Sequence, residues 1–117
     1  MRDFRKLDIW KDSVQLATMV YELSESFPQS ELYGLTSQVR RASVSMASNI
    51  AEGCKGGNKE LIHYLNIAMG SSFELETQFI IANNIKLIDN TALANISSVI
   101  NTLQKRINAF RNSIKAN

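Results

Sequence analysis

The chain has 117 residues, of which 44% are hydrophobic and 21% are charged, and 13 basic against 11 acidic side chains give a net charge of +2. This length allows one domain with one modest core, and the composition excludes a disordered protein. The charged N-terminus is unlike a signal peptide, no run approaches 18 apolar residues, and one cysteine cannot form an internal disulfide, so we expect a cytoplasmic protein without a membrane partner.

Three breaks divide the chain into four segments whose apolar residues recur at helical spacing: Pro28, the glycine cluster at 53–57, and Asp89-Asn90-Thr91. We therefore expect helices at roughly 8–27, 34–53, 58–88 and 91–115. No segment alternates with the period of two that is typical of a strand. Because short joints make consecutive helices antiparallel neighbours, the sequence predicts an all-α fold, with residues 1–117 forming a single up-down-up-down antiparallel four-helix bundle.

The first segment carries two adjacent apolar seams, and the third and fourth carry one each. We expect Asn58 to cap the third helix and Thr91, or a neighbouring Asp or Asn, to cap the fourth. The predicted core seams of these three segments are Ile9, Ser13, Leu16, Val20, Leu23 and Phe27; Leu61, Leu65, Ala68, Ser72, Leu75, Phe79 and Ala82; and Ile96, Ile100, Leu103, Ile107, Phe110 and Ile114. The second seam of the first segment is Trp10, Val14, Ala17, Tyr21 and Ser24.

The second segment departs from a simple amphipathic pattern in two ways. Asn49 falls on its core seam, where its amide needs hydrogen-bond partners, and we interpret it as a structural polar residue that fixes register. Val44, Ala47 and Ala51 lie on the opposite side, where the helix of a monomer would be polar. This outward apolar stripe, together with the double seam of the first segment, predicts a subunit interface in a homo-oligomer.

Three stretches closely resemble one family: "FRKLDIWKDS", "ELYGLTSQVRRASVSMASNIAEG" and "YLNIAMGSSFELETQ". They are similar to bacterial 23S rRNA-intervening-sequence proteins, over about Phe4 to Asp89. Met46-Ala47 stands where that family more often has Ile-Pro, and the fourth helix matches only in character. The resemblance implies a small cytoplasmic bundle assembled as a ring-like homopentamer. It also implies a distant similarity to the accessory variability protein of diversity-generating retroelements, a basic pentamer that works with a reverse transcriptase and nucleic acid.

The glycine-rich stretch "NIAEGCKGGNKE" at 49–60 does not fit a phosphate-binding P-loop, because Gly57-Asn58-Lys59 replaces the required Gly-Lys pair and a helix precedes it. We favour a plain turn, with Gly53 as a left-handed helix stop. The alternative is a weak anion contact at the start of the third helix, assisted by Lys55 and Lys59.

No enzyme chemistry is predicted. Cys54 follows a helix C-terminus, which disfavours a thiolate, and His63, the only histidine, points away from the core seam, so we do not expect a Cys–His pair. One Cys and one His cannot supply a usual zinc site, and we expect no metal or other cofactor. We assign Glu74 to a structural pair with Arg41, because an antiparallel hairpin brings these two residues within one helical turn.

Binding remains as the predicted function. We expect Arg40, Arg41, Lys55 and Lys59 to contact nucleic acid, either RNA or DNA, because a ring repeats each weak phosphate contact once per subunit. Basic residues also gather near the N-terminus, and the alternative for all of them is a solvated face. No aromatics are interleaved with them, so we do not expect sequence-specific single-strand recognition. The proposed partner is nucleic acid or a nucleic-acid-handling protein; the alternative function is a protein scaffold without nucleic-acid affinity. The basic residues near the N-terminus are Arg2, Arg5, Lys6 and Lys11.

Overall fold

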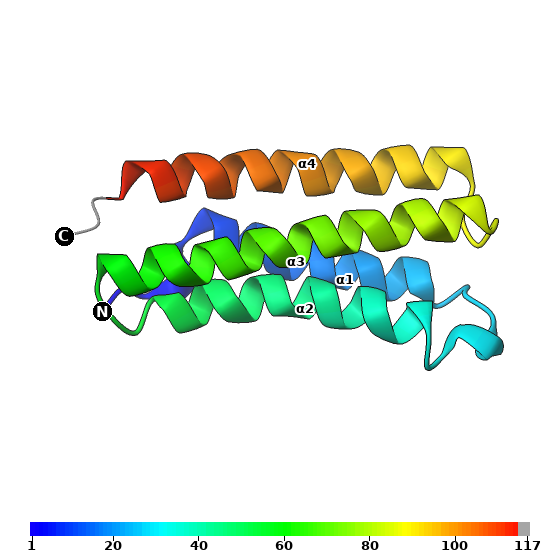
Figure 1. Ribbon diagram of the computed structural model, residues 1–117, viewed down its shortest axis with the longest axis horizontal. Coiled ribbons are helices and arrows are strands. Elements are labelled where there is room, and N and C mark those ends of the chain that lie inside the picture. The colour runs from blue at the N-terminus through cyan, green and yellow to red at the C-terminus, as the bar shows by residue number, and fades with distance from the viewer. Residues whose placement is uncertain (115–117) are drawn as a thin grey trace.

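A computed structural model describes residues 1–114 as four helices and two single-turn 3-10 helices, with no strand in that range. The 3-10 helices are η1 (Phe4–Lys6) and η2 (Gln29–Glu31), and the four helices are α1 (Asp8–Ser24), α2 (Leu35–Gly53), α3 (Asn58–Asn84) and α4 (Asn90–Ser113). Figure 1 shows consecutive helices running antiparallel, with the N-terminus and the α2–α3 joint at one end. The predicted all-α, up-down-up-down bundle is confirmed. Residues 115–117, with the expected end of the fourth helix at 115, lie outside the described residues.

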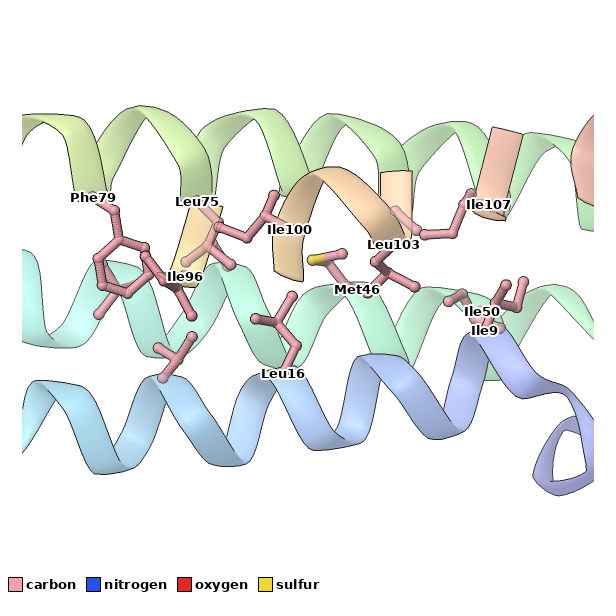
Figure 2. Close-up of a cluster of buried hydrophobic side chains, with 14 of the residues drawn as sticks. Ile9, Leu16, Met46, Ile50, Leu75, Phe79, Ile96, Ile100, Leu103 and Ile107 are labelled. Carbon is pink, nitrogen blue, oxygen red and sulfur yellow. The ribbon is translucent and has the colours of Figure 1, made fainter. Parts of the chain in front are cut away.

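Each helix packs against its neighbour in the chain, and α4 closes the bundle against α1, giving an elongated body of 46 × 23 × 19 Å. Figure 2 shows apolar side chains from all four helices pointing into one interior, among them Leu16, Met46, Phe79 and Ile100. These four side chains are at most 2% exposed. Because burial of apolar area stabilises a fold in proportion to that area, the buried apolar seams of all four helices hold the bundle together. No helix within residues 1–114 is long and apolar enough to cross a membrane.

The predicted helix ends are wrong in two places. The helix expected over 8–27 ends at Ser24, three residues early. The helix expected over 58–88 ends at Asn84, because Lys86 adopts the left-handed conformation with φ 67°. The Leu87 amide then donates to the Ala82 carbonyl (2.8 Å) and the Lys86 amide to the Asn83 carbonyl (3.0 Å), which is the Schellman pattern of helix termination.

The predicted N-cap is confirmed for α4 and wrong for α3. Asp89 precedes α4 and its side chain accepts a hydrogen bond from the Ala92 amide (2.8 Å), so an Asp beside Thr91 is the cap. Asn58 does not cap α3. Gly57 occupies the cap position without a side-chain bond, and Asn58 is the first helical residue.

The core position assigned to Asn49 is wrong, because Ile50 fills it with its side chain fully buried. Asn49 is half-buried and its amide donates to the Ser45 carbonyl (2.8 Å) and hydroxyl (2.9 Å). The Ser45 hydroxyl in turn pairs with that of Ser71 on α3 (2.9 Å). Asn49 is therefore a satisfied structural amide, but at the edge of the α2–α3 contact and not in the core.

Gly53 is not a left-handed helix stop. It is the buried last residue of α2, and no glycine within residues 1–114 has a positive φ. A Cβ at this position would lie 2.9 Å from the Tyr64 Cβ and 3.1 Å from Leu61 Cδ1 on α3. The glycine is required because the two helices approach too closely for a side chain.

Candidate functional site

Three hollows follow one side of α2, which faces α1 and, at its C-terminal end, the N-terminal segment. The middle one, which we call the groove, has a volume of about 450 Å³. Val44 and Ala47 of the predicted interface line it, opposite Val14 and Tyr21 from the second seam of α1. Val14, Tyr21 and Val44 are 38%, 43% and 42% exposed, so a continuous apolar strip faces outward. Ala51, the third predicted interface residue, lies one turn further along and lines the next hollow.

The second hollow is made by the N-terminal segment, which crosses the α2–α3 joint. The Arg2 amide donates to the Cys54 carbonyl (3.0 Å), and the Arg2 guanidinium donates to Asn58 Oδ1 (3.4 Å) and lies 5.8 Å from the Phe110 ring centroid. This contact encloses a hollow of about 430 Å³ between Phe4, Arg5 and Lys55. Sequence reasoning missed the arrangement, because a backbone hydrogen bond carries no side-chain pattern.

The N-terminal contact gathers basic residues that are about fifty positions apart in the chain. We call this group the basic end: Arg2, Arg5 and Lys55 line the hollow, Lys6 follows Arg5 in η1, and Lys59 follows Asn58, which Arg2 contacts, in the first turn of α3. Three carboxylates, Asp3, Glu52 and Glu60, lie among these five cations. Two of the cations form ion pairs: Arg5 with Asp3 (3.0 Å) and Lys55 with Glu52 (2.6 Å).

These ion pairs shift two pKa values in the expected directions. Hydrogen bonds from the Arg5 side chain and amide lower the pKa of Asp3, and the hydrogen bond to Glu52 raises the pKa of Lys55. Both pairs are on the surface, where solvation and side-chain entropy cancel most of the gain from pairing.

Arg40 and Arg41 lie elsewhere. Arg41 lies twelve positions before the end of α2 at Gly53, or about 18 Å at 1.5 Å per residue, and Lys55 lies beyond that end. The four predicted contacts therefore form two separate groups. Arg40 is half-buried: its Nε donates to the Ser24 hydroxyl (2.9 Å), and its guanidinium lies 4.7 Å from the Tyr21 ring centroid. Arg41 is exposed on the next flank of α2.

The predicted pair between Arg41 and Glu74 is not formed. The ion pairs within residues 1–114 join other side chains, and Glu74 Oε1 instead accepts from Gln78 Nε2 on its own helix (3.3 Å). The two residues are on neighbouring helices but at exposed positions, where solvation removes most of the gain from pairing.

The third hollow, about 470 Å³, brings aromatic and basic residues together. Tyr33 is 93% exposed and stands at this hollow with Arg41, while Tyr21 and Arg40 form its inner wall. The expectation that no aromatic accompanies the basic residues is therefore wrong here. A signal was present in the double seam of α1, which places Tyr21 on the side that α2 covers. The full lining is Tyr21, Leu32, Tyr33, Thr36, Ser37, Arg40, Arg41 and Val44.

Cys54 and His63 have separate structural surroundings. Cys54 is 2% exposed and its thiol donates to the Ile50 carbonyl (3.3 Å), and burial raises the pKa of this thiol. A raised pKa opposes formation of the nucleophilic thiolate. His63 is exposed and its ring packs edge-on against Tyr64, with centroids 5.3 Å apart. Within residues 1–114 no three His, Cys, Asp or Glu side chains are grouped as for a metal ion.

Comparison with known proteins gives a family and a fold. The family model described as 23S rRNA-intervening sequence protein matches residues 5–109. A solved crystal structure from Bacteroides thetaiotaomicron, described as a protein with unknown function from the S23 ribosomal protein family, is similar with a TM-score of 0.79. It is 17% identical, and the alignment covers 90% of this chain and 99% of that one, so it supports the fold alone. No curated protein matches the chain.

Proposed function

The chain belongs to the 23S rRNA-intervening sequence protein family, and from that premise we propose that it is a non-enzymatic, self-associating bundle that binds nucleic acid through repeated basic patches. The observation that carries the proposal is the hydrogen bond from the Arg2 amide to the Cys54 carbonyl. It joins cations from two distant parts of the chain into the basic end.

The energetics favour weak contacts that add. Five cations against three carboxylates leave each basic end with a small excess of two positive charges. A single such patch gives little affinity, but linked copies raise the effective concentration of the next contact. Because counterions are released at each neutralised phosphate, the affinity falls steeply with salt.

The groove supplies a reason for the copies to associate. Val14, Tyr21 and Val44 expose apolar surface beside the small side chains of Ala17 and Ala47. Small residues allow another helix to approach closely, and covering such a strip releases water from apolar area. The resemblance to the family supports a ring of five copies.

The decisive experiment is fluorescence anisotropy with labelled RNA and DNA between about 50 and about 200 mM salt. We compare the wild-type protein with Lys55→Gln/Lys59→Gln, and use Lys86→Gln/Lys105→Gln as a control that removes the same charge away from the basic end. The first variant should lower the log–log salt slope by up to about 1.8 on duplex, because each phosphate contact adds roughly 0.9. The control should keep the wild-type slope.

The outcomes separate the two functions that the sequence leaves open. A slope that is the same in both variants would show that Lys55 and Lys59 do not contact phosphate. Absence of binding by the wild-type protein at the lowest salt would favour the alternative, a scaffold that recognises another protein and has no nucleic-acid affinity.

A further inference from the structure

We infer that the hollow between α1 and the start of α2 binds an unpaired nucleotide, with its base stacked on Tyr33 and its phosphate held by Arg41. We call this hollow the Tyr33 pocket. The inference rests on the proposed nucleic-acid function and narrows it, at this site, to single-stranded RNA or DNA.

The aromatic ring is the first argument. Tyr33 is 93% exposed, more than any other large hydrophobic side chain in the described part of the chain except Met1. Its backbone is nevertheless anchored, because two hydrogen bonds join Glu31, which precedes it, to the residues that follow it. The Gly34 amide donates to the Glu31 carbonyl (2.9 Å), and the Leu35 amide donates to Glu31 Oε1 (3.1 Å). A ring on an anchored segment with its faces in water is a stacking platform, and a nucleobase is the ligand that such platforms take.

The charges beside the ring are the second argument. Within residues 1–114, Arg40 Nε donates to the Ser24 hydroxyl, and the guanidinium stacks on the Tyr21 ring. Arg41 is exposed at the same hollow and forms no ion pair within residues 1–114. Guanidinium groups bind phosphate through a planar fork of donors. An aromatic ring and two guanidiniums at one hollow therefore match the two parts of a nucleotide.

The neighbouring acidic group does not oppose an anion strongly. Glu31 Oε1 accepts from the Leu35 amide at the N-terminal end of α2, which offsets part of the negative charge, and the first turn of α2 contains no acidic residue. Thr36 and Ser37 add hydroxyl groups to the lining. The hollow itself, about 470 Å³, is within the range of small-molecule sites, roughly 300–1,000 Å³.

The geometry also explains why the ligand should be single-stranded. In a duplex each base is paired and stacked on its neighbours, so its flat face is covered and cannot reach Tyr33. In an unpaired strand the bases can turn outward and stack on protein rings. The basic end recognises only phosphates and treats both forms alike, whereas the Tyr33 pocket distinguishes them.

The test uses fluorescein-labelled single strands of poly(U) and poly(dT) and a labelled DNA duplex of equal length, with the full chain. Tyr33→Leu should weaken binding of both single strands about tenfold, the scale of losing one stacked base, and leave duplex binding unchanged. Tyr33→Phe keeps the ring and should bind like the wild-type protein. Phe73→Leu is the matched control, because Phe73 is also a strongly exposed aromatic, 56%, but on α3. Arg41→Gln should weaken single-strand binding and reduce the salt slope by about 0.7.

Light scattering on each variant completes the test. Unchanged particle mass with selective loss of single-strand affinity in Tyr33→Leu would support the pocket. Equal single-strand affinity in Tyr33→Leu and the wild-type protein would overturn it while leaving the proposed function intact. A fall in particle mass together with affinity would assign Tyr33 to a subunit contact and also overturn it. A wild-type protein that binds neither form would refute the proposed function itself.

Discussion

Asn101 on α4 donates from its side-chain amide to Glu76 Oε2 on α3 across 3.1 Å. Gln104, one turn further along α4, donates to Glu76 Oε1 (3.2 Å) and to the Ser72 hydroxyl (3.2 Å). The Asn101 amide also donates to Gln104 Oε1 (3.0 Å), which closes the network. These four residues, the α3–α4 clasp, fix the register of the two helices, together with Arg111 on α4, whose guanidinium donates to Asn66 Oδ1 on α3 (2.7 Å).

Removal of the carboxylate at the centre of the clasp should destabilise the fold. Glu76→Ala loses two hydrogen bonds to a charged acceptor and leaves each of the two amides with one of its two acceptors, so the free energy of unfolding should fall by about 1–3 kcal/mol. Urea denaturation followed by circular dichroism measures the change. Glu22→Ala, at an exposed position of α1, is the control and should change stability by less than about 0.5 kcal/mol. Equal effects of the two substitutions would mean that the clasp contributes nothing.

Two glycines in helices should respond to alanine with opposite signs. Gly70 lies on the exposed face of α3 with open space around it, so Gly70→Ala should stabilise the protein by about 0.5–1 kcal/mol through helix propensity. At Gly53 a Cβ would meet the Tyr64 Cβ at 2.9 Å, and separating α2 from α3 should cost about 1–3 kcal/mol. Paired urea titrations give both values. Stabilisation by Gly53→Ala would show that the helices can part without loss.

The protein should be more stable with glycine in place of Lys86. Its φ of 67° is a left-handed conformation that costs a residue with a Cβ about 1–2 kcal/mol, and glycine adopts it without that cost. Lys86→Gly should therefore raise the free energy of unfolding by about 0.5–1 kcal/mol. Lys105→Gly, inside α4, is the matched control and should lower it by about 1 kcal/mol. Thermal denaturation of the two variants should shift in opposite directions, and a parallel shift would contradict the Schellman assignment.

A charge in the groove should weaken self-association. The wild-type particle should have several times the chain mass of 13.1 kDa by light scattering. Val44→Glu places a carboxylate against apolar surface, where an unpaired buried charge is strongly unfavourable, and should lower that mass. Ala94→Glu, on the exposed side of α4, should leave it unchanged. A wild-type monomer at micromolar concentration would refute the groove as a subunit contact.

The helical pattern was enough to predict the bundle, because a one-sided apolar stripe has few ways to be buried. It was not enough to choose between adjacent positions on the stripe. Asn49 and Ile50 differ by 100° around α2, and spacings of three or four residues fit either until the packing of α3 decides. The end of α3 was missed for a different reason: Lys86 occupies a position where glycine is the usual signal.

The candidate site was less predictable than the fold. The groove followed from outward apolar residues on both α1 and α2. The basic end could not be predicted in this way, since it depends on the backbone hydrogen bond between Arg2 and Cys54. The Tyr33 pocket forms because the joint before α2 folds back against α1. This fold brings Tyr21 and Tyr33, which are twelve positions apart in the chain, to one hollow.

Tyr21 and Val44 line both the groove and the Tyr33 pocket. A second copy in the groove would therefore hold one wall of the pocket in place, and a nucleotide in the pocket would hold one wall of the groove. Thermodynamic reciprocity makes these two effects equal: the factor by which self-association changes strand affinity is the factor by which a strand changes self-association. The affinity of this protein for a nucleic-acid strand would then depend on protein concentration. The ring and the monomer would bind the strand with different affinities even though their sequence is the same.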